Sequence, residues 1–556
     1  MKIFKNILIT LTILGLSGCK FLDFNESVGD SKDFFYSYFD NVKRLLTYPY
    51  SLLYEDFGSV DGAMLDCATD DAEYAYSKSL VQGFNDGSWS AMKTLDSTWN
   101  VSYTAIRSLN DFISTFAETD FSRFKNNIDY AQSMAEIQSY PYEARLLRVI
   151  FLFDLAKRYG DIPMPLKTLT ITEANEITKT PFDDVIVYIV NECDSTAEHL
   201  PVNYVNEISG ETGRVTKGIA MALKSRALLY AASKLHNPGN DVNKWQKAAM
   251  ASLDLINSNI YILEPNINTV ITNSVTSREV IMERRNTDNN AFEKLNFPIG
   301  YQGGQSGTCP SQNLVDAFQT KNGYDVVLTA TGWNSADPGF NPNSPYANRD
   351  PRLYKSILYD GATWKGRPVE SFIGGLDGYP IQGATPTGYY LRKYLVETVD
   401  LSPSINSMAK HHWIVFRYAE TLLNYAEAMN EAFGPTYSDA TYTLTALAAL
   451  NQVGTRATMP ALSGLTKDAF TTALRRERRV EFAFEGLRFW DVRRWMIGES
   501  TQKTINGVSI SKNAGGLKTY TLNNIDSRVW DDKMYFYPIP QQELNINKNL
   551  SQNKGW

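Results

Sequence analysis

The sequence is poor in the residues that build catalytic and metal centres. It has only four histidines and four cysteines among 556 residues. No HExxH, P-loop, GxSxG or dinucleotide-binding pattern is present. The cysteines lack the close spacing of zinc sites or disulfide frameworks, so we expect Cys67, Cys193 and Cys309 to be buried thiols. These absences predict a protein without a metal or a cofactor.

Positive charge is also scarce. Lys and Arg number 54 against 61 Asp and Glu, which leaves a net charge of −7. Because nucleic acids and anionic membrane surfaces are bound mainly through basic patches, this balance argues against both partners. The 12% aromatic content, by contrast, supplies both a core and rings that can stack on the apolar faces of ligands.

The apolar run at the start of the chain is too short to cross a membrane. Ile7–Leu16 would form a helix of about 15 Å, half of a ~30 Å hydrocarbon core. Lys2 and Lys5 precede this run, as in an export signal. Leu16-Ser17-Gly18-Cys19 resembles a bacterial lipobox, which predicts a signal peptide over residues 1–18 and acylation of Cys19. The alternative is an ordinary secretory signal with an incidental cysteine.

The mature chain, residues 19–556, contains no low-complexity linker, and we interpret it as one domain. Helical patterns dominate about 96–258 and 413–496. Between them, residues 300–412 hold 14 of the 35 glycines, which favours loops and short strands. The sequence therefore predicts a mainly α-helical scaffold that carries an irregular, loop-rich insertion over about 286–412.

Apolar periodicity locates individual helices. Leu147, Phe151 and Leu155 recur at helical spacing, and Val415, Ala419, Leu422, Ala426, Met429 and Phe433 form one stripe. Small residues such as Ala222 and Ala227 would let helices approach closely, as in tetratricopeptide pairs. Farther on, Thr466 can cap a helix whose apolar face holds Phe470, Ala473, Val480, Phe484 and Leu487.

That last helix also carries the densest cluster of charge. Glu477, Glu481 and Glu485 lie four residues apart among several arginines. Paired carboxylates can perform glycoside hydrolysis, but the catalytic acid needs a raised pKa, and neighbouring guanidinium groups would hold the carboxylates ionised. We therefore expect a structural lattice of ion pairs. His411 and His412, just before a predicted helix, are expected to cap it or to face solvent.

Seven segments in a fixed order resemble the SusD/RagB family of Bacteroidetes outer-membrane lipoproteins. They include the helix YEARLLRVIFLFDLAKRYGDIPMPL, the turn RDPRL and the arginine-rich RRERRVEFAFEGLRFWDVRRW. The segments cover residues 142–166, 214–233, 349–353, 417–432, 450–457, 475–495 and 537–556.

The resemblance implies a mainly helical fold in which tetratricopeptide-like helix pairs support a variable ligand-binding face. It implies a cell-surface lipoprotein of the outer membrane, without enzymatic activity, that binds polysaccharide or oligosaccharide. It further implies a partner, a SusC-like TonB-dependent transporter that receives the glycan. A minority of the family binds peptides, and peptide capture is therefore the alternative function. A polysaccharide-cleaving lipoprotein and a purely structural scaffold are further alternatives.

The ligand site is predicted by region. A sugar ring needs aromatic platforms for its apolar face and polar side chains for its hydroxyl groups. Three loop regions offer both, and from them we predict a site formed by Trp89, Tyr301, Trp333, Asn85, Asn334 and Tyr76. Trp364, Tyr389 and Tyr390 are reserve candidates.

Overall fold

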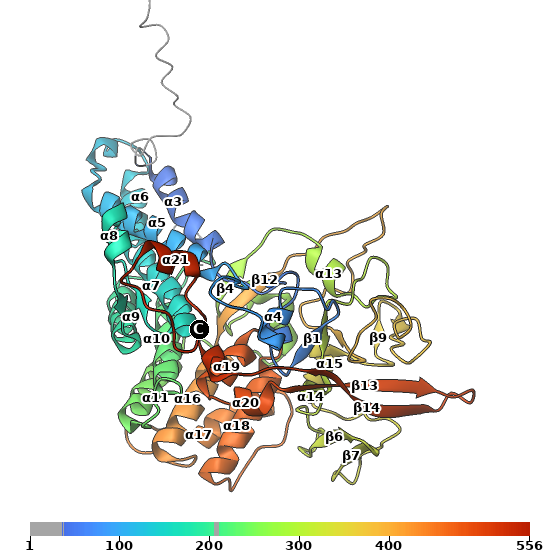
Figure 1. Ribbon diagram of the computed structural model, residues 1–556. Coiled ribbons are helices and arrows are strands. Elements are labelled where there is room, and N and C mark those ends of the chain that lie inside the picture. The colour runs from blue at the N-terminus through green and yellow to red at the C-terminus, as the bar shows by residue number, and fades with distance from the viewer. Residues whose placement is uncertain (1–35, 37, 205–210) are drawn as a thin grey trace, which may run out of the picture.

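The computed structural model describes residue 36 and residues 38–204 and 211–556. The predicted signal peptide and Cys19 lie outside the described residues. Within them the protein is mainly helical, as predicted, and its strands are short (Figure 1). The longer helices are α3 (Phe39–Ser51), α5 (Thr98–Glu118), α6 (Tyr130–Ile137), α7 (Tyr140–Tyr159), α9 (Phe182–Ala197), α10 (Lys217–Ala232), α11 (Val242–Asn257), α16 (Tyr418–Phe433), α17 (Ala446–Arg456), α18 (Lys467–Glu481) and α19 (Leu487–Arg494).

The long helices stack in series. Contacts join α5 to α7, α7 to α9, α9 to α10, α10 to α11, and α11 to α16, which also contacts α17 and α18. In Figure 1 these helices form a continuous column along one side of the molecule. Small residues permit this spacing: Ala222 and Ala227 of α10 are buried, as the sequence pattern predicts, and so is Ala220. Serial pairing of this kind matches the expected tetratricopeptide-like scaffold.

The short helices and the strands lie mostly outside the column. The short helices are α4 (Gln82–Asp86), α8 (Ile171–Glu176), α12 (Ile267–Thr272), α13 (Ala291–Asn296), α14 (Gln312–Val315), α15 (Leu353–Ser356), α20 (Gly498–Thr501) and α21 (Gln541–Ile546). The described strands form seven antiparallel pairs. These are β1 (Ala72–Tyr74) with β5 (Thr308–Pro310), β2 (Ile162–Pro163) with β3 (Lys179–Thr180), β4 (Val280–Arg285) with β12 (His412–Arg417), β6 (Val326–Thr329) with β7 (Gly332–Ser335), β8 (Ile357–Leu358) with β11 (Tyr390–Leu391), β9 (Thr363–Trp364) with β10 (Arg367–Pro368), and β13 (Thr504–Lys512) with β14 (Lys518–Ser527).

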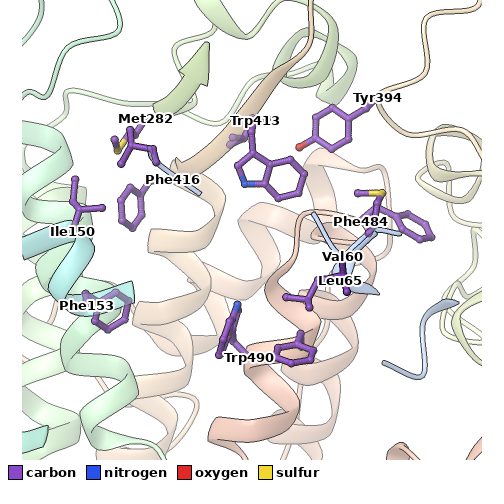
Figure 2. Packing of buried hydrophobic residues seen from close by; sticks show 14 of the residues in the cluster. Val60, Leu65, Ile150, Phe153, Met282, Tyr394, Trp413, Phe416, Phe484 and Trp490 are labelled. Carbon is purple, nitrogen blue, oxygen red and sulfur yellow. The ribbon is translucent and has the colours of Figure 1, made fainter. Parts of the chain in front are cut away.

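The hydrophobic core runs from the helical column into the irregular region. Figure 2 shows Ile150 and Phe153 of α7 near Phe416 of β12, with Trp413 and Tyr394 farther along the same layer. A second cluster fills the space among α11, α16, α17 and α18. The first cluster includes residues of the helical column and of the irregular region. The loops of the irregular region therefore pack on the same hydrophobic core as the helices.

The structure corrects two predicted helix boundaries. The apolar stripe that was expected to begin at Val415 belongs to two elements, since β12 runs to Arg417 and α16 begins at Tyr418. Similarly, α18 is capped by Thr466 as predicted but ends at Glu481. Phe484 and Gly486 then adopt left-handed φ angles of 61° and 70°, so the chain turns before Leu487 begins α19.

The histidine prediction was also wrong. His412 begins strand β12 instead of capping a helix. His411 is 4% exposed, and its Nε2 lies 3.0 Å from the carboxylate of Glu293. The cysteine prediction is confirmed, because Cys67, Cys193 and Cys309 are all buried and unpaired.

The predicted lattice of ion pairs is present and buried. Arg417 lies 2.7 Å from both Glu481 and Glu485, and Arg352 pairs with Glu481 and with Glu477. Arg456 adds a further pair to Glu481. We call this group, together with Glu279 and Lys393, the buried ion lattice.

The lattice does not shift the pKa values of all three glutamates in the same direction. Burial alone would raise the pKa of Glu481, but Arg456, Arg417 and Arg352 outweigh it and hold that pKa well below its ordinary value. The pKa of Glu485 is also lowered, because Arg417 and Lys393 outweigh its burial. At Glu477, however, burial prevails over Arg352 and raises the pKa. The pKa values of two of the three carboxylates are therefore shifted in the direction that neighbouring guanidinium groups would give.

Within the described ranges, no helix combines the length and the apolar character that a membrane crossing requires.

Candidate functional site

The structure brings two of the predicted site residues together. Tyr76 follows strand β1 and is 38% exposed, and its hydroxyl group donates to the backbone oxygen of Gln305 at 2.8 Å. Tyr301 belongs to the same loop as Gln305, since the Gly304 N–H donates to the Tyr301 oxygen. The pairing of β1 with β5 positions both segments, because β5 begins directly after this loop.

Tyr301 supports the loop and presents little ring surface. Its side chain is buried, and the guanidinium group of Arg367 covers the ring with its carbon 3.7 Å from the ring centre. The hydroxyl group donates to the backbone oxygens of Trp364 and Arg367. Tyr301 therefore fixes the loop to the β9–β10 hairpin.

The region around Trp89 differs from the expected exposed platform. Trp89 is only 2% exposed, and it packs against Phe84, Tyr537 and Trp556. Asn85 is also buried and donates to the Cys67 oxygen and to Gln82. Trp89 is buried because the C-terminal segment, with Tyr537 and Trp556, packs against this loop.

Trp333 and Asn334 lie on β7. The Trp333 ring is 8% exposed and packs edge-on against Tyr346 and against Tyr520 of β14, while Asn334 faces solvent. The reserve candidates Trp364, Tyr389 and Tyr390 are buried. The ligand-binding role predicted for these residues stays a prediction. Three of the side chains, Trp89, Asn85 and Trp333, are buried, and Asn334 is exposed.

Sequence reasoning missed the most exposed aromatic ring of the irregular region. The loop at 372–384 presents Leu376, Tyr379 and Ile381 with exposed fractions of 56%, 72% and 38%. A signal was available: in GGLDGYPIQG, apolar residues alternate with glycines that let a loop expose them.

Close contacts join this loop to Tyr76 and to the loop at 299–305. The Ser306 hydroxyl group donates to the Gly383 oxygen at 2.6 Å, and a Cβ at Gly383 would lie 4.0 Å from the Tyr76 hydroxyl oxygen. At Gly300, a Cβ would lie only 2.1 Å from the Leu376 oxygen, so only glycine allows the approach. We call the surface formed by Tyr76, Leu376, Tyr379 and Ile381 the aromatic face.

An ion pair between the partly exposed Arg367 and the buried Asp377 holds the loop in place. Arg367 contacts both carboxylate oxygens of Asp377 at 2.7 and 2.8 Å, and Asp377 is fully buried. The same carboxylate accepts the Glu370 N–H, and Arg367 also donates to the Gly300 oxygen. This two-point pairing fixes the position of the exposed side chains next to it.

The aromatic face combines exposed apolar side chains with exposed amides. Gln302, Gln305 and Gln382 are exposed in the same two loops. Such a surface can stack on the apolar face of a ring and exchange hydrogen bonds with hydroxyl groups. The Asp377 carboxylate is engaged by Arg367, and the Glu370 carboxylate accepts the Leu376 N–H. Across the described ranges, no group of three His, Cys, Asp or Glu side chains is placed to hold a metal ion.

Comparison with known proteins identifies the family. The model of the SusD family matches residues 278–556, half of the chain. The chain belongs to the SusD family. The resemblance inferred from seven segments is thereby confirmed.

Individual relatives of this SusD-family chain agree with that result. SusD-like protein P2 of Formosa agariphila is 24% identical over 461 residues, which cover 82% of this chain and 79% of the relative. A SusD-like protein of Bacteroides fragilis has a similar structure, with 26% identity, a TM-score of 0.78, and coverage of 95% of this chain and 99% of that one. Another B. fragilis structure, of a SusD-like carbohydrate binding protein, has 24% identity, a TM-score of 0.74, and coverage of 93% and 100%.

Proposed function

We propose that this SusD-family protein is a lipid-anchored protein of the outer-membrane surface that binds extracellular glycan on its aromatic face. It passes the glycan, without cleaving it, to a SusC-like TonB-dependent transporter. Family membership supports the general role. The observation that carries the glycan assignment is Tyr379, which is 72% exposed on a loop that approaches Tyr76 at Gly383 and that the Arg367–Asp377 pair holds in place.

The arrangement suits a sugar chain physically. Exposed rings and aliphatic side chains cover the C–H faces of sugar rings, and neighbouring glutamines reach the hydroxyl groups. Reversible capture needs only modest strength, with Kd between about 1 μM and 1 mM, or about −8 to −4 kcal/mol. Of the residues predicted from sequence, Tyr76 belongs to this face, and Tyr301 supports it from below.

Replacing the exposed rings tests the proposal. We expect Tyr379→Ala and Tyr76→Ala each to weaken glycan binding about tenfold, or about 1.4 kcal/mol, because each removes one stacking surface. Binding would be measured by calorimetry on the domain lacking residues 1–19, after a glycan-array screen. Tyr48→Ala is the matched control, since Tyr48 is 50% exposed on α3, which packs against α5 and α7.

The same screen separates the alternatives. Binding of peptides and of no glycan would replace glycan capture with the peptide alternative. New reducing ends after incubation with a bound glycan would show cleavage and contradict the proposal. Equal affinities of the Tyr379→Ala, Tyr76→Ala and wild-type proteins would remove the aromatic face from the binding site.

The proposed anchor and partner can be tested in cells. We expect Cys19→Ala to move the protein from the membrane fraction to the soluble fraction, because stable anchoring requires the acyl chains. Wild-type protein should be purified together with an outer-membrane β-barrel protein. Cys193→Ala is the control, because Cys193 is buried and unpaired and should leave the location unchanged. Membrane retention of Cys19→Ala would contradict the anchor.

A further inference from the structure

A cavity is lined in part by Trp364 of the β9–β10 hairpin, the hairpin that Tyr301 also contacts. It has a volume of about 360 Å³ and lies between α12, the α15–β8 segment and the residues that precede β12. That volume is within the range of small-ligand sites. Trp364 connects the cavity to the loop of Tyr301. Its backbone oxygen accepts a hydrogen bond from the Tyr301 hydroxyl group, and Trp364 also lines the cavity.

Three side chains give this cavity positive charge. Lys355, Arg392 and Lys410 all line it. Within the described ranges, the side chains of Lys355 and Arg392 make no hydrogen bond or ion pair. The carboxylate of Asp288 lies 3.8 Å from Lys410, and both side chains are more than half exposed, so this pair is weak. We call this site the basic cavity.

The fold brings the backbone segments that carry two of these cations close together. The Arg392 N–H donates to the Ser356 oxygen at 3.0 Å, directly after the β8–β11 pairing, and Ser356 follows Lys355 in the chain. The Arg392 guanidinium carbon lies 5.6 Å from the ring centre of Trp364. A cation held over an aromatic ring is ordered before a ligand arrives. The Trp364 ring is 1% exposed, and its Nε1–H has no hydrogen-bond acceptor within the described residues.

Nearby acids do not cancel this charge. The acidic residues that line the cavity are Glu397 and Glu481. Glu481 is engaged by arginines of the buried ion lattice, one of which is Arg352, also in the cavity wall. Lys393, another wall residue, is paired with Glu485. Glu397 accepts the Lys365 N–H, and it is the one lining acid left to oppose three cations.

The histidines of the cavity wall add little charge. His411 is paired with the carboxylate of Glu293. Burial lowers the pKa of His412, so its ring is neutral at pH 7. The electrostatic character of the cavity therefore comes from Lys355, Arg392 and Lys410, in a chain whose net charge is −7.

We infer that the basic cavity binds the anionic substituent, a carboxylate or a sulfate group, of an acidic sugar unit. The planar guanidinium group of Arg392 can donate two parallel hydrogen bonds to either group, and the lysines supply further charge. The inference rests on the proposed function for the sugar to which the anion is attached. It narrows the glycans of this protein to acidic ones.

The test uses one small anion for each of the two anionic groups, the carboxylate and the sulfate. Sodium galacturonate supplies a carboxylate, sodium sulfate supplies a free sulfate ion, and galactose with sodium chloride at equal ionic strength is the neutral reference. We expect calorimetry to show binding of galacturonate or of sulfate above the reference. Arg392→Gln should weaken that binding about tenfold, or about 1.4 kcal/mol, because it removes the positively charged guanidinium group that donates two parallel hydrogen bonds.

Control variants separate this inference from the aromatic face. Arg44→Gln removes an exposed arginine of α3 and should leave anion binding unchanged. Tyr379→Ala should weaken glycan binding while keeping the affinity for the small anions. Absence of binding by both anions, or equal affinities of wild-type and folded Arg392→Gln protein, would overturn the inference whether or not the aromatic face binds glycan.

Discussion

Arg417→Ala is expected to lower the free energy of unfolding by about 3–5 kcal/mol, the cost of breaking a buried ion pair on one side. Arg417 is 2% exposed and contacts Glu279, Glu481 and Glu485 at 2.7–2.8 Å. Its removal leaves carboxylates with fewer partners inside the protein, where water cannot replace the lost guanidinium group. Urea unfolding at pH 7, followed by circular dichroism, would measure the change.

A surface pair provides the matched control for this result. Lys224 lies 2.7 Å from Asp194, whose side chain is 56% exposed. Lys224→Ala should change the free energy of unfolding by less than about 1 kcal/mol, because exposed pairs are screened by solvent. Equal effects of the two substitutions would mean that the lattice contributes no more than a surface ion pair.

Arg349→Met is expected to lower the free energy of unfolding by about 3 kcal/mol. The Arg349 side chain is 1% exposed, and its guanidinium group donates to the backbone oxygens of Val315, Phe318 and Pro345. Methionine preserves most of the volume but removes the donor of the Phe318 and Pro345 carbonyl groups, at about 1–3 kcal/mol for each buried group, while the Val315 oxygen keeps the Phe318 N–H. The same unfolding experiment would measure the loss.

The Arg349 guanidinium group also lies 5.9 Å from the ring centre of Trp333. We therefore expect the substitution to change the environment of that ring as well. Arg476→Met is the control, since Arg476 is one-third exposed and pairs with the exposed Asp325. A loss below 1 kcal/mol for Arg349→Met would show that water satisfies the carbonyl groups of Phe318 and Pro345.

Local patterns in the sequence predicted the helical part of the fold. Alanines at helical spacing marked the packed face of α10, and Thr466 marked the start of α18. These features depend on residues within a few turns of one another. The end of α18 could not be predicted in the same way. Phe484 adopts a left-handed φ angle, which is uncommon for a bulky residue and which no local pattern indicates.

The candidate site depended on contacts that local patterns do not reveal. Trp89 and Tyr76 occupy similar loops in the sequence, yet Trp89 is covered by Tyr537 and Trp556, while Tyr76 stays exposed. Tyr379 is exposed because Arg367 and Asp377 pin its loop from below. Which ring faces solvent is thus decided by residues far away in the chain, and the sequence alone names only the candidates.

The packing of Trp89 against Trp556 constrains the order in which the molecule can assemble. The two indole rings have centres 4.5 Å apart although they come from distant positions in the chain. Until the polypeptide has been made as far as residue 556, the pocket around Trp89 lacks one wall. The early loop therefore completes its packing only when Trp556 is in place, and a fragment that stops earlier would leave an indole ring open to water, chaperones or other chains.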